Sequence, residues 1–468
     1  MNYNTLSEYV LTWKPDKKSL KRPIYQSLAA QMEGDIANGI LLPGTKLPPQ
    51  RELANYLGVN FTTITRAYQI CELKGLVYGV VGSGTFVSSR ASSNVTISEE
   101  QDKKDLIDLG FVASFESTNR LIENKISEFL NQKHLSELLN YSYPTGMPHQ
   151  RAAGANWLSQ IGVNADAEHI LIVSGVQNGI ALVLMSLFEP GNRIAVDKYT
   201  FANFIELAKM RKIHLIPIES DDEGISADEL EKQCSLASIQ GIFLMPSCCN
   251  PTTVMISEKR KLELAEVIKK HNLILIEDDI HAFFTAGITA EYKGSIQRLI
   301  PENTVYIGGT SKAICSGLRV AYIVSPDRYL ESLSQALFNV NVKTSGVDIE
   351  IITGTILTGL SVTILKEKIE LAIKRNQIFK NVFTETPVFG NPTGFYRWLP
   401  IVSDKSGLTI EREIRKNGIS VFHSDRFLCG SRQKPQYLRI ALSTEESDER
   451  FAEGLIKLKN LIKSRSIC

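Results

Sequence analysis

Residues 306–326 read YIGGTSKAICSGLRVAYIVSP, and this stretch decides the fold because it sets one lysine between two apolar, strand-like segments. Lys312 lies among small residues, and Arg319 follows seven positions later with almost no other charge nearby. Most lysines lie on helices or loop tips, where water solvates the ammonium group. A lysine at the end of a buried strand predicts a chemical site. The plain alternative is a solvated lysine followed by a salt-bridged arginine.

The chain after residue 105 alternates between short apolar runs and helical patterns such as residues 257–272. Runs that are apolar throughout are typical of parallel strands buried on both faces, so an α/β domain with a mostly parallel sheet is predicted. Ligands in such sheets bind outside the carboxyl ends of the strands. The predicted strands are HILIVS (169–174), RIAVD (193–197), GIFLMPS (241–247), LILIED (273–278) and TVYIGG (304–309).

Polar residues follow three of these strands. Residues 175–178 open a helix whose free amides could hold an anion, residues 277–279 are acidic, and residues 310–312 end in the lysine. Pyridoxal phosphate needs this set: a helix start and an arginine for its phosphate, a carboxylate for its ring nitrogen and a lysine for its aldehyde. The combination predicts that cofactor, although Asp278 alone could be a helix cap.

The first ninety residues predict a smaller domain. Apolar residues at every fourth position give a helix from residue 24 to 38, a second helix ends at Gly58, and a third follows Asn60. Two β-like runs around residues 82–84 then form a hairpin. Helix, turn, helix and hairpin describe a winged helix-turn-helix, whose third helix lies in the major groove of DNA.

Base contacts are expected from the start of the third helix, and Arg51 on the preceding helix is expected to grip a phosphate. Residues 1–90 carry ten Lys/Arg against six Asp/Glu, an excess that weakly favours nucleic acid. The alternative is a helical domain that docks on the rest of the chain. The residues expected to face the bases are Phe61, Thr62, Thr63, Thr65 and Arg66.

Composition fits an ordinary globular protein of two or three domains. The 468 residues are 43% hydrophobic and 22% charged. Seven cysteines without a CxxC pair, and no His cluster, predict a reducing cytoplasm and no metal site. The N-terminus lacks an apolar signal segment, and the apolar run 351–365 is shorter than a membrane span, so we expect a buried helix there and no membrane contact.

Residues 23–87 resemble the GntR-family DNA-binding domain along their whole length, most clearly in "PG.KLP..RELA" and in the "G.GTFV" wing. The resemblance implies a double-stranded DNA operator and a wing contact at Gly84. The family often has a basic residue at the position of Phe61, so the operator sequence cannot be carried over.

The remainder resembles class I aminotransferases of fold type I. The matching motifs are YSYPTGMPHQR, VSGVQNGIALVLMSLFEPGNRIAVDKYTF, PSCCNPTT, IEDDIHAFF, GGTSKAICSGLRVAYIVSP and YLRIALS. The resemblance implies that Lys312 holds the cofactor covalently and that Asp278 pairs with the pyridine nitrogen. Asn250 would bond the ring hydroxyl, His281 stands where a tyrosine usually does so, and Phe201 would stack on the ring.

The same resemblance assigns the remaining contacts. Gln177, Ser311 and Arg319 would surround the phosphate. Tyr141 falls where a tyrosine reaches the phosphate in the partner subunit, which implies a homodimer. Arg439 falls where an arginine clamps a substrate carboxylate.

Several positions depart from the aminotransferase pattern, and these favour cofactor binding over efficient transamination. None of them removes the lysine, the carboxylate or the late arginine. The departures are His281, Thr253 for Gly, Val176 for Ser, Gly309 for Ser and Ser316 for Pro.

The order of the parts resembles the MocR/GabR subfamily of bacterial transcription regulators. It implies a DNA-binding domain in residues 1–88, a linker in 89–105 and a cofactor-binding domain in 106–468. Such a regulator would use pyridoxal phosphate to sense an amino compound or the cofactor itself. Two alternatives remain: an aminotransferase with an accessory DNA-binding domain, and a regulator whose large domain has lost the cofactor and only dimerises.

Overall fold

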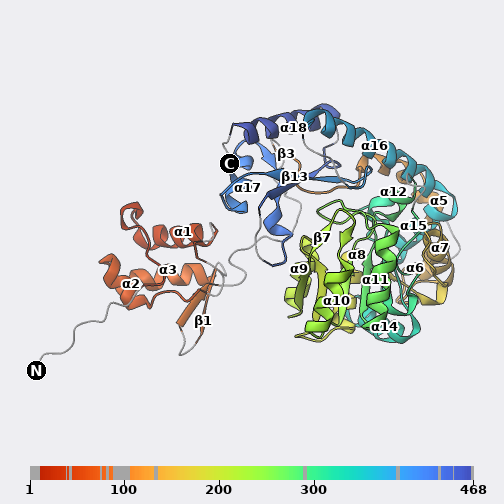
Figure 1. The fold of residues 1–468 in the computed structure, drawn as a ribbon, viewed down its shortest axis with the longest axis horizontal. Helices are drawn as coiled ribbons and strands as arrows, with labels where there is room; N and C mark the ends of the chain where they lie inside the picture. The colour runs from red at the N-terminus through yellow and green to blue at the C-terminus, as the bar shows by residue number, and fades with distance from the viewer. Residues whose placement is uncertain are drawn as a thin grey trace, which may run out of the picture. The chain divides into compact units, whose positions relative to one another are not determined.

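The computed structural model describes most of the chain, in two compact units. The N-terminal unit holds α1 to β2, and the larger unit begins at β3 (Figure 1). The predicted linker 89–105 lies outside the described residues. The described ranges are 11–37, 40–41, 45–73, 76–80, 84–87, 106–130, 135–287, 292–385, 390–430, 434–445 and 447–464.

The N-terminal unit has the predicted order of three helices and a hairpin. The second helix ends at Gly58, whose left-handed φ of 68° suits glycine, and the Asn60 side chain accepts from the Thr62 amide at 3.0 Å. The predicted four-residue periodicity of the first helix is confirmed, because Leu28, Met32 and Ile36 are buried. The elements are η1 (Lys17–Ser19), α1 (Ile24–Ala37), α2 (Gln50–Leu57), α3 (Phe61–Leu73), β1 (Val77–Val80) and β2 (Gly84–Val87).

The larger unit is built on a seven-stranded sheet in the order β4-β12-β11-β10-β9-β5-β6. All five predicted strands are present; β12 runs antiparallel to both of its neighbours, β4 and β11, and the other neighbouring pairs are parallel. The strands are β4 (Ile170–Val173), β5 (Arg193–Asp197), β6 (His214–Ile218), β9 (Gly241–Leu244), β10 (Ile274–Asp278), β11 (Thr304–Gly309) and β12 (Ala321–Val324).

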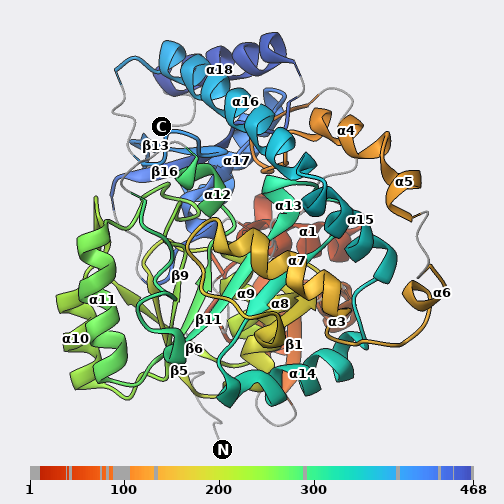
Figure 2. The same ribbon diagram turned by 90° about the vertical axis from the view of Figure 1, so that its right-hand side faces the viewer.

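Helices cover both faces of this sheet, which is why its strands are apolar throughout. Successive residues of β4 show the alternation: Ile170 and Ile172 pack with Trp157 of α7, whereas Leu171 and Val173 pack with Ile180 of α8. Figure 2 shows α10 and α11 side by side along the β5–β6 end. The covering helices are α7 (Pro148–Ser159), α8 (Val176–Ser186), α9 (Ala202–Met210), α10 (Ala227–Leu236), α11 (Glu258–Lys270), α14 (Asp327–Asn341) and α15 (Gly346–Leu357).

A second lobe of the larger unit carries a small sheet in the order β13-β16-β15. Its long helices α16 (Leu360–Val382) and α18 (Asp448–Lys463) lie side by side in both views (Figures 1 and 2). The strands are β13 (Tyr396–Ile401), β15 (Phe422–His423), β16 (Gln436–Ala441), and the parallel pair β3 (Ile107–Asp108) and β14 (Ile419–Ser420).

Short elements complete the described chain. They are η2 (Glu116–Asn119), α4 (Arg120–Glu123), α5 (Ile126–Leu130), α6 (Leu135–Leu138), η3 (Ala167–His169), β7 (Ser220–Asp221), β8 (Gly224–Ile225), α12 (Ala282–Ala286), η4 (Pro301–Asn303), α13 (Thr310–Ala313), α17 (Gly407–Lys416) and η5 (Ser424–Arg426).

The apolar run 351–365 is two helices rather than the single buried helix predicted. Gly359, at a left-handed φ of 75°, separates α15 from α16, which are bent by 84°. Among the described residues, no single helix is long and apolar enough to cross a membrane, and this bent pair passes such a test only jointly.

Candidate functional site

A cavity of about 530 Å³ opens at the carboxyl ends of β10 and β11 in the larger unit. It brings together nine residues that the sequence singled out, from five of the quoted motifs. Tyr141 does not line it, because its side chain is 82% exposed elsewhere on the surface of the unit. The nine residues are Gln177, Phe201, Asn250, Asp278, His281, Ser311, Lys312, Arg319 and Arg439.

Lys312 lies on α13, the short helix that directly follows β11. Its Nζ donates to the backbone carbonyls of Val112 at 2.6 Å and Ala113 at 3.0 Å. Burial, together with the nearby Lys368 ammonium, lowers the pKa of the Lys312 amine to about 7. The amine is therefore available in its neutral, nucleophilic form near neutral pH.

Asp278 ends β10 and is 4% exposed. Its Oδ1 atom has no hydrogen-bond partner in the described part of the chain. Burial, with a smaller contribution from the Asp279 carboxylate, raises the pKa of this carboxyl to about 7. A buried acceptor without a donor is costly unless a ligand supplies one. A protonated pyridine nitrogen is such a donor, so this residue fits the predicted cofactor.

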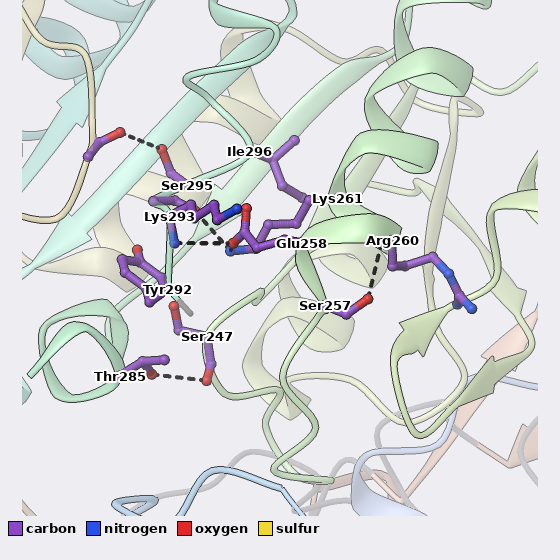
Figure 3. A network of polar contacts seen from close by, with 12 residues as sticks. Ser247, Ser257, Glu258, Arg260, Lys261, Thr285, Tyr292, Lys293, Ser295 and Ile296 are labelled. Atoms are coloured by element: carbon purple, nitrogen blue, oxygen red, sulfur yellow. Dashed lines mark hydrogen bonds and ion pairs between the residues drawn. The ribbon is translucent and has the colours of Figure 1, made fainter. Parts of the chain in front are cut away.

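Asp279 and His281, which follow Asp278, differ in their contacts: hydrogen bonds from Ser247 hold Asp279, whereas one ring nitrogen of His281 has no described partner. Asp279 accepts from the Ser247 amide at 3.0 Å and the Ser247 hydroxyl at 2.8 Å. The Ser247 carbonyl in turn accepts from Thr285 at 3.3 Å (Figure 3). His281 is buried, and burial lowers the pKa of its imidazole to about 3, with Lys312 contributing. Its Nδ1 has no described partner, which leaves a neutral ring nitrogen where a tyrosine was expected.

The anion end of the cavity is built from Gly175 and Arg319. The Arg319 guanidinium donates to the Ser311 hydroxyl at 3.1 Å. Gly175 has a φ of 86°, and a Cβ there would lie 2.4 Å from Arg319 Nη2, so only glycine lets the arginine approach. Gln177, in the first turn of α8, accepts from the Asn203 side chain at 3.2 Å.

Two departures from the aminotransferase pattern meet in this region. A Cβ on Gly309 would lie 2.4 Å from the Val176 Cγ2 atom, so the valine occupies space that a serine at 309 would need. The wall is therefore apolar where the aminotransferase pattern has hydroxyls, and Ser311, Arg319 and the α8 amides remain as groups that could hold an anion there.

Arg439 lies on β16 with 2% exposure. Its guanidinium donates to Asn250 Oδ1 at 3.0 Å and to the Gly110 carbonyl at 2.7 Å, while Nε has no described partner. The rings of Tyr396 and Phe427 lie 5.7 and 4.9 Å from it. Burial lowers its pKa to about 10, still well above neutral. A buried arginine without a carboxylate partner fits a ligand carboxylate.

Sequence reasoning missed two charged residues, one that lines the cavity and one that is buried beside Lys312. Glu116 lines it and accepts from the Ser316 hydroxyl at 2.8 Å. Lys368 on α16 is fully buried beside Lys312. A signal existed for Lys368, because it continues the buried face marked by Ile364 and Ala372 at four-residue spacing.

The N-terminal unit carries the predicted DNA-binding residues on α2, α3 and β2. Phe61, Thr62 and Arg66 are exposed, and Arg51 of α2 lies over the Phe61 ring at 5.9 Å. The Thr65 hydroxyl already donates a hydrogen bond within the unit, to the Gln50 side chain at 2.8 Å. Thr63 is half-buried in the first turn of α3, and Gly84 is the exposed first residue of β2.

Comparison with known proteins agrees with both units. Residues 24–87 match the model of bacterial regulatory proteins of the gntR family, and residues 105–455 match aminotransferase class I and II. The match to a kynurenine aminotransferase from Pyrococcus horikoshii spans 77% of this chain and 92% of the aminotransferase, with 19% identity and a TM-score of 0.70. The match to a multiple substrate aminotransferase from Thermococcus profundus spans 81% of this chain and 98% of that enzyme, with 19% identity and a TM-score of 0.71. These two likenesses concern the fold alone.

Curated relatives match across both units. The HTH-type transcriptional regulator YdeF of Bacillus subtilis is 33% identical over 99% of both chains. The probable rhizopine catabolism regulatory protein MocR of Rhizobium meliloti is 24% identical over 76% of each. The chain therefore belongs to the MocR-type family of HTH transcriptional regulators, in which a gntR-family DNA-binding domain is fused to an aminotransferase class I and II domain.

Proposed function

We propose that this regulator binds pyridoxal phosphate at Lys312 and uses it to sense a small amino compound, or the cofactor itself. The observation that carries the proposal is the unpaired, buried Oδ1 of Asp278 in the cavity that holds Lys312. Family membership accounts for the fold. The cofactor proposal rests instead on Asp278 Oδ1, a buried acceptor without a described donor, in the same cavity as the Lys312 amine with its lowered pKa.

When bound, the cofactor supplies an aldehyde and an electron-withdrawing ring. Lys312 would hold the aldehyde covalently, and Asp278 would keep the ring nitrogen protonated. Asn250 and His281 lie on the cavity wall where the ring hydroxyl is expected, and Phe201 would cover the ring face. Ser311, Arg319 and Gln177 would hold the phosphate together with the amides at the start of α8.

Arg439 would select an effector that carries a carboxylate. The guanidinium now donates to Asn250 and to the Gly110 carbonyl, so a ligand carboxylate would compete with both. The effector can shift the protein only by its differential affinity for the two states, and these exchanged hydrogen bonds provide one source of that difference. Amines and amino sulfonates are further effector classes to test.

The regulator would act as a homodimer on a double-stranded operator. Tyr141 and its neighbours Leu139 and Tyr143 are exposed on the larger unit, as expected for a surface that a second copy covers. Arg51 would contact a phosphate, and the first turns of α3 would read base edges.

The test is the visible absorption spectrum of the purified protein with added pyridoxal phosphate, titrated with a panel of amino compounds. We expect a band of lysine-bound cofactor that is absent in Lys312→Ala. A compound that shifts the band and changes operator affinity, without forming the pyridoxamine form, identifies the effector. If no band forms, the larger unit does not bind the cofactor and the sensor proposal is wrong.

An aminotransferase with an accessory DNA-binding domain is the second candidate, because the cavity retains Lys312, Asp278 and Arg439 together. Net conversion of an amino acid and a keto acid, lost in Lys312→Ala, would put this candidate first. The apolar wall at Val176 and Gly309 favours weak turnover.

A further inference from the structure

Lys368 is a buried cation with no acidic partner among the described residues. It lies on α16, its side chain has 0% exposure, and its Nζ contacts three oxygens. These are Ser114 Oγ at 2.7 Å, the Lys312 carbonyl at 3.0 Å and the Ile314 carbonyl at 2.8 Å. Burying a charge without a counter-charge is costly, so this arrangement calls for an explanation.

Counting protons shows which form of Lys368 the contacts require. The two carbonyls can only accept. The Ser114 hydroxyl proton goes to the Ser311 carbonyl at 2.6 Å, so its oxygen must also accept from Lys368. Three acceptors need three N–H groups, which only the ammonium form provides. Each contact lies within hydrogen-bond range, so the protein is built around a charged Lys368.

The same count gives the opposite result for Lys312. Its Nζ has two acceptors, the carbonyls of Val112 and Ala113. A neutral amine has two N–H groups, so it satisfies both and keeps its lone pair unused. Two neighbouring ammonium groups repel each other, and the one with fewer acceptors among the described residues is the one that loses its proton.

We propose that Lys368 is a positioning residue of the cofactor site: it is the member of the lysine pair that keeps its proton, and its charge and three hydrogen bonds hold Lys312 in place as a neutral amine. This inference rests on the proposed function, because a neutral Lys312 matters only if that amine binds a carbonyl group. It goes further in naming which of two buried lysines carries the charge.

Electrostatics of the surroundings agree with this assignment. Burial lowers the pKa of both amines to about 7, so burial alone does not separate them, but the three hydrogen bonds that Lys368 donates favour its ammonium form. The other charged or titratable groups that act on the pair are Arg439, Arg319, Glu116, Cys315 and His281. Arg439 and Arg319 lower the pKa of Lys312 and not that of Lys368, which again makes Lys312 the neutral member.

The experiment measures the Lys312 amine itself, in the full-length protein without cofactor. A trace of acetic anhydride labels neutral amines, and peptide mass spectrometry gives the rate at Lys312 from pH 5 to 11. We expect a midpoint near neutrality in the wild type. In Lys368→Met the midpoint should rise by about one pH unit, which lowers the labelling rate at pH 7 by up to ~10-fold.

Matched variants keep the test decisive. Lys368→Arg retains a charge and should keep the midpoint low, and Lys366→Met, an exposed lysine on the same helix, should leave it unchanged. Ser114→Ala removes one acceptor of the Lys368 ammonium and leaves both lysines in place, so it should raise the midpoint at Lys312 by a smaller amount. This milder variant still tests the proposal if Lys368→Met does not fold.

Two results would overturn the assignment. One is a wild-type midpoint at the ordinary value for lysine, near 10.4. The other is an unchanged midpoint in Lys368→Met, or in Ser114→Ala where Lys368→Met does not fold. Failure of the cofactor proposal looks different: Lys312 would still titrate near neutrality and respond to Lys368, but added pyridoxal phosphate would give no lysine-bound band.

Discussion

Asp278 should make the cofactor-free protein less stable as pH rises. Burial raises the pKa of this carboxyl from 3.8 to about 7, so the folded state holds a proton that the unfolded chain has released. Unfolding then releases a proton between these values, and the free energy of unfolding falls as pH increases from about 4 to about 7. Above pH 7 the penalty is fully present.

Asp278→Asn should therefore stabilise the cofactor-free protein at pH 8 and weaken cofactor binding. We expect a gain of about 1–4 kcal/mol over the wild type at pH 8 that shrinks to near zero at pH 4. Urea unfolding at several pH values measures it, with the exposed Asp222→Asn as control. A gain that does not change with pH would show that the Asp278 carboxyl titrates normally.

Gly309 and Val176 should behave as a coupled pair. Gly309→Ser introduces a Cβ 2.4 Å from Val176 Cγ2 and 3.1 Å from Ile280 Cδ1. Overpacking of this kind costs about 1–3 kcal/mol of unfolding free energy. Val176→Ala removes the closest atom, so the double variant should recover most of the loss. Additive effects in thermal or urea unfolding would show that the two positions do not share this space.

At the scale of elements, the sequence predicted the helices and strands that a local residue pattern marks. Five buried strands were found from their apolar runs, and the end of α2 from Gly58. The edge strand β6 was missed because HLIPI is half exposed and contains Pro217. The antiparallel direction of β12 and the 84° bend after α15 depend on tertiary packing, which no window of sequence contains.

The site residues that lie within recognisable sequence motifs were predicted. Nine expected residues line one cavity. Asp278, Lys312 and Arg319 were found from their positions at or after predicted strand ends, whereas Phe201, Asn250, His281 and Arg439 came from the resemblance to aminotransferase motifs. Lys368 was missed because the sequence around it, KEKIELAIKR, is typical of a solvated helix surface. The backbone carbonyls of residues 110, 112 and 113 were missed for a different reason: every residue has a carbonyl, so only the fold shows which ones bind Arg439 and Lys312.

The winged-helix element gives a prediction about DNA. Arg51 is exposed on α2 beside Phe61, the first residue of α3. If it grips a phosphate, Arg51→Ala should weaken operator binding and reduce the slope of log K against log salt by about 1. Binding to unrelated duplexes should weaken to a similar degree, because phosphates carry no sequence. Fluorescence anisotropy at several salt concentrations measures both, and an unchanged affinity and slope would contradict the proposed docking.

At the scale of the whole molecule, Tyr141 was assigned a contact to the cofactor phosphate, yet it does not line the cavity of its own subunit. It is 82% exposed and lies outside the cavity, on a loop whose carbonyls at Asn140 and Ser142 accept from Lys343. Exposed apolar side chains on this loop and at the end of α14 include Leu139 and Phe338. If a second copy covers this surface, each cofactor site would combine Lys312 of one subunit with Tyr141 of the other.

Mixed dimers test this arrangement, because the two residues would then complement each other across subunits. Tyr141→Ala and Lys312→Ala should each impair cofactor binding alone. A heterodimer of the two variants should regain one normal site, since one subunit supplies the lysine and the other the tyrosine. In the matched control, a double variant mixed with wild type, both sites of each heterodimer are defective. Equal binding by both heterodimers, measured from the visible band after tandem affinity purification, would place Tyr141 outside the shared site.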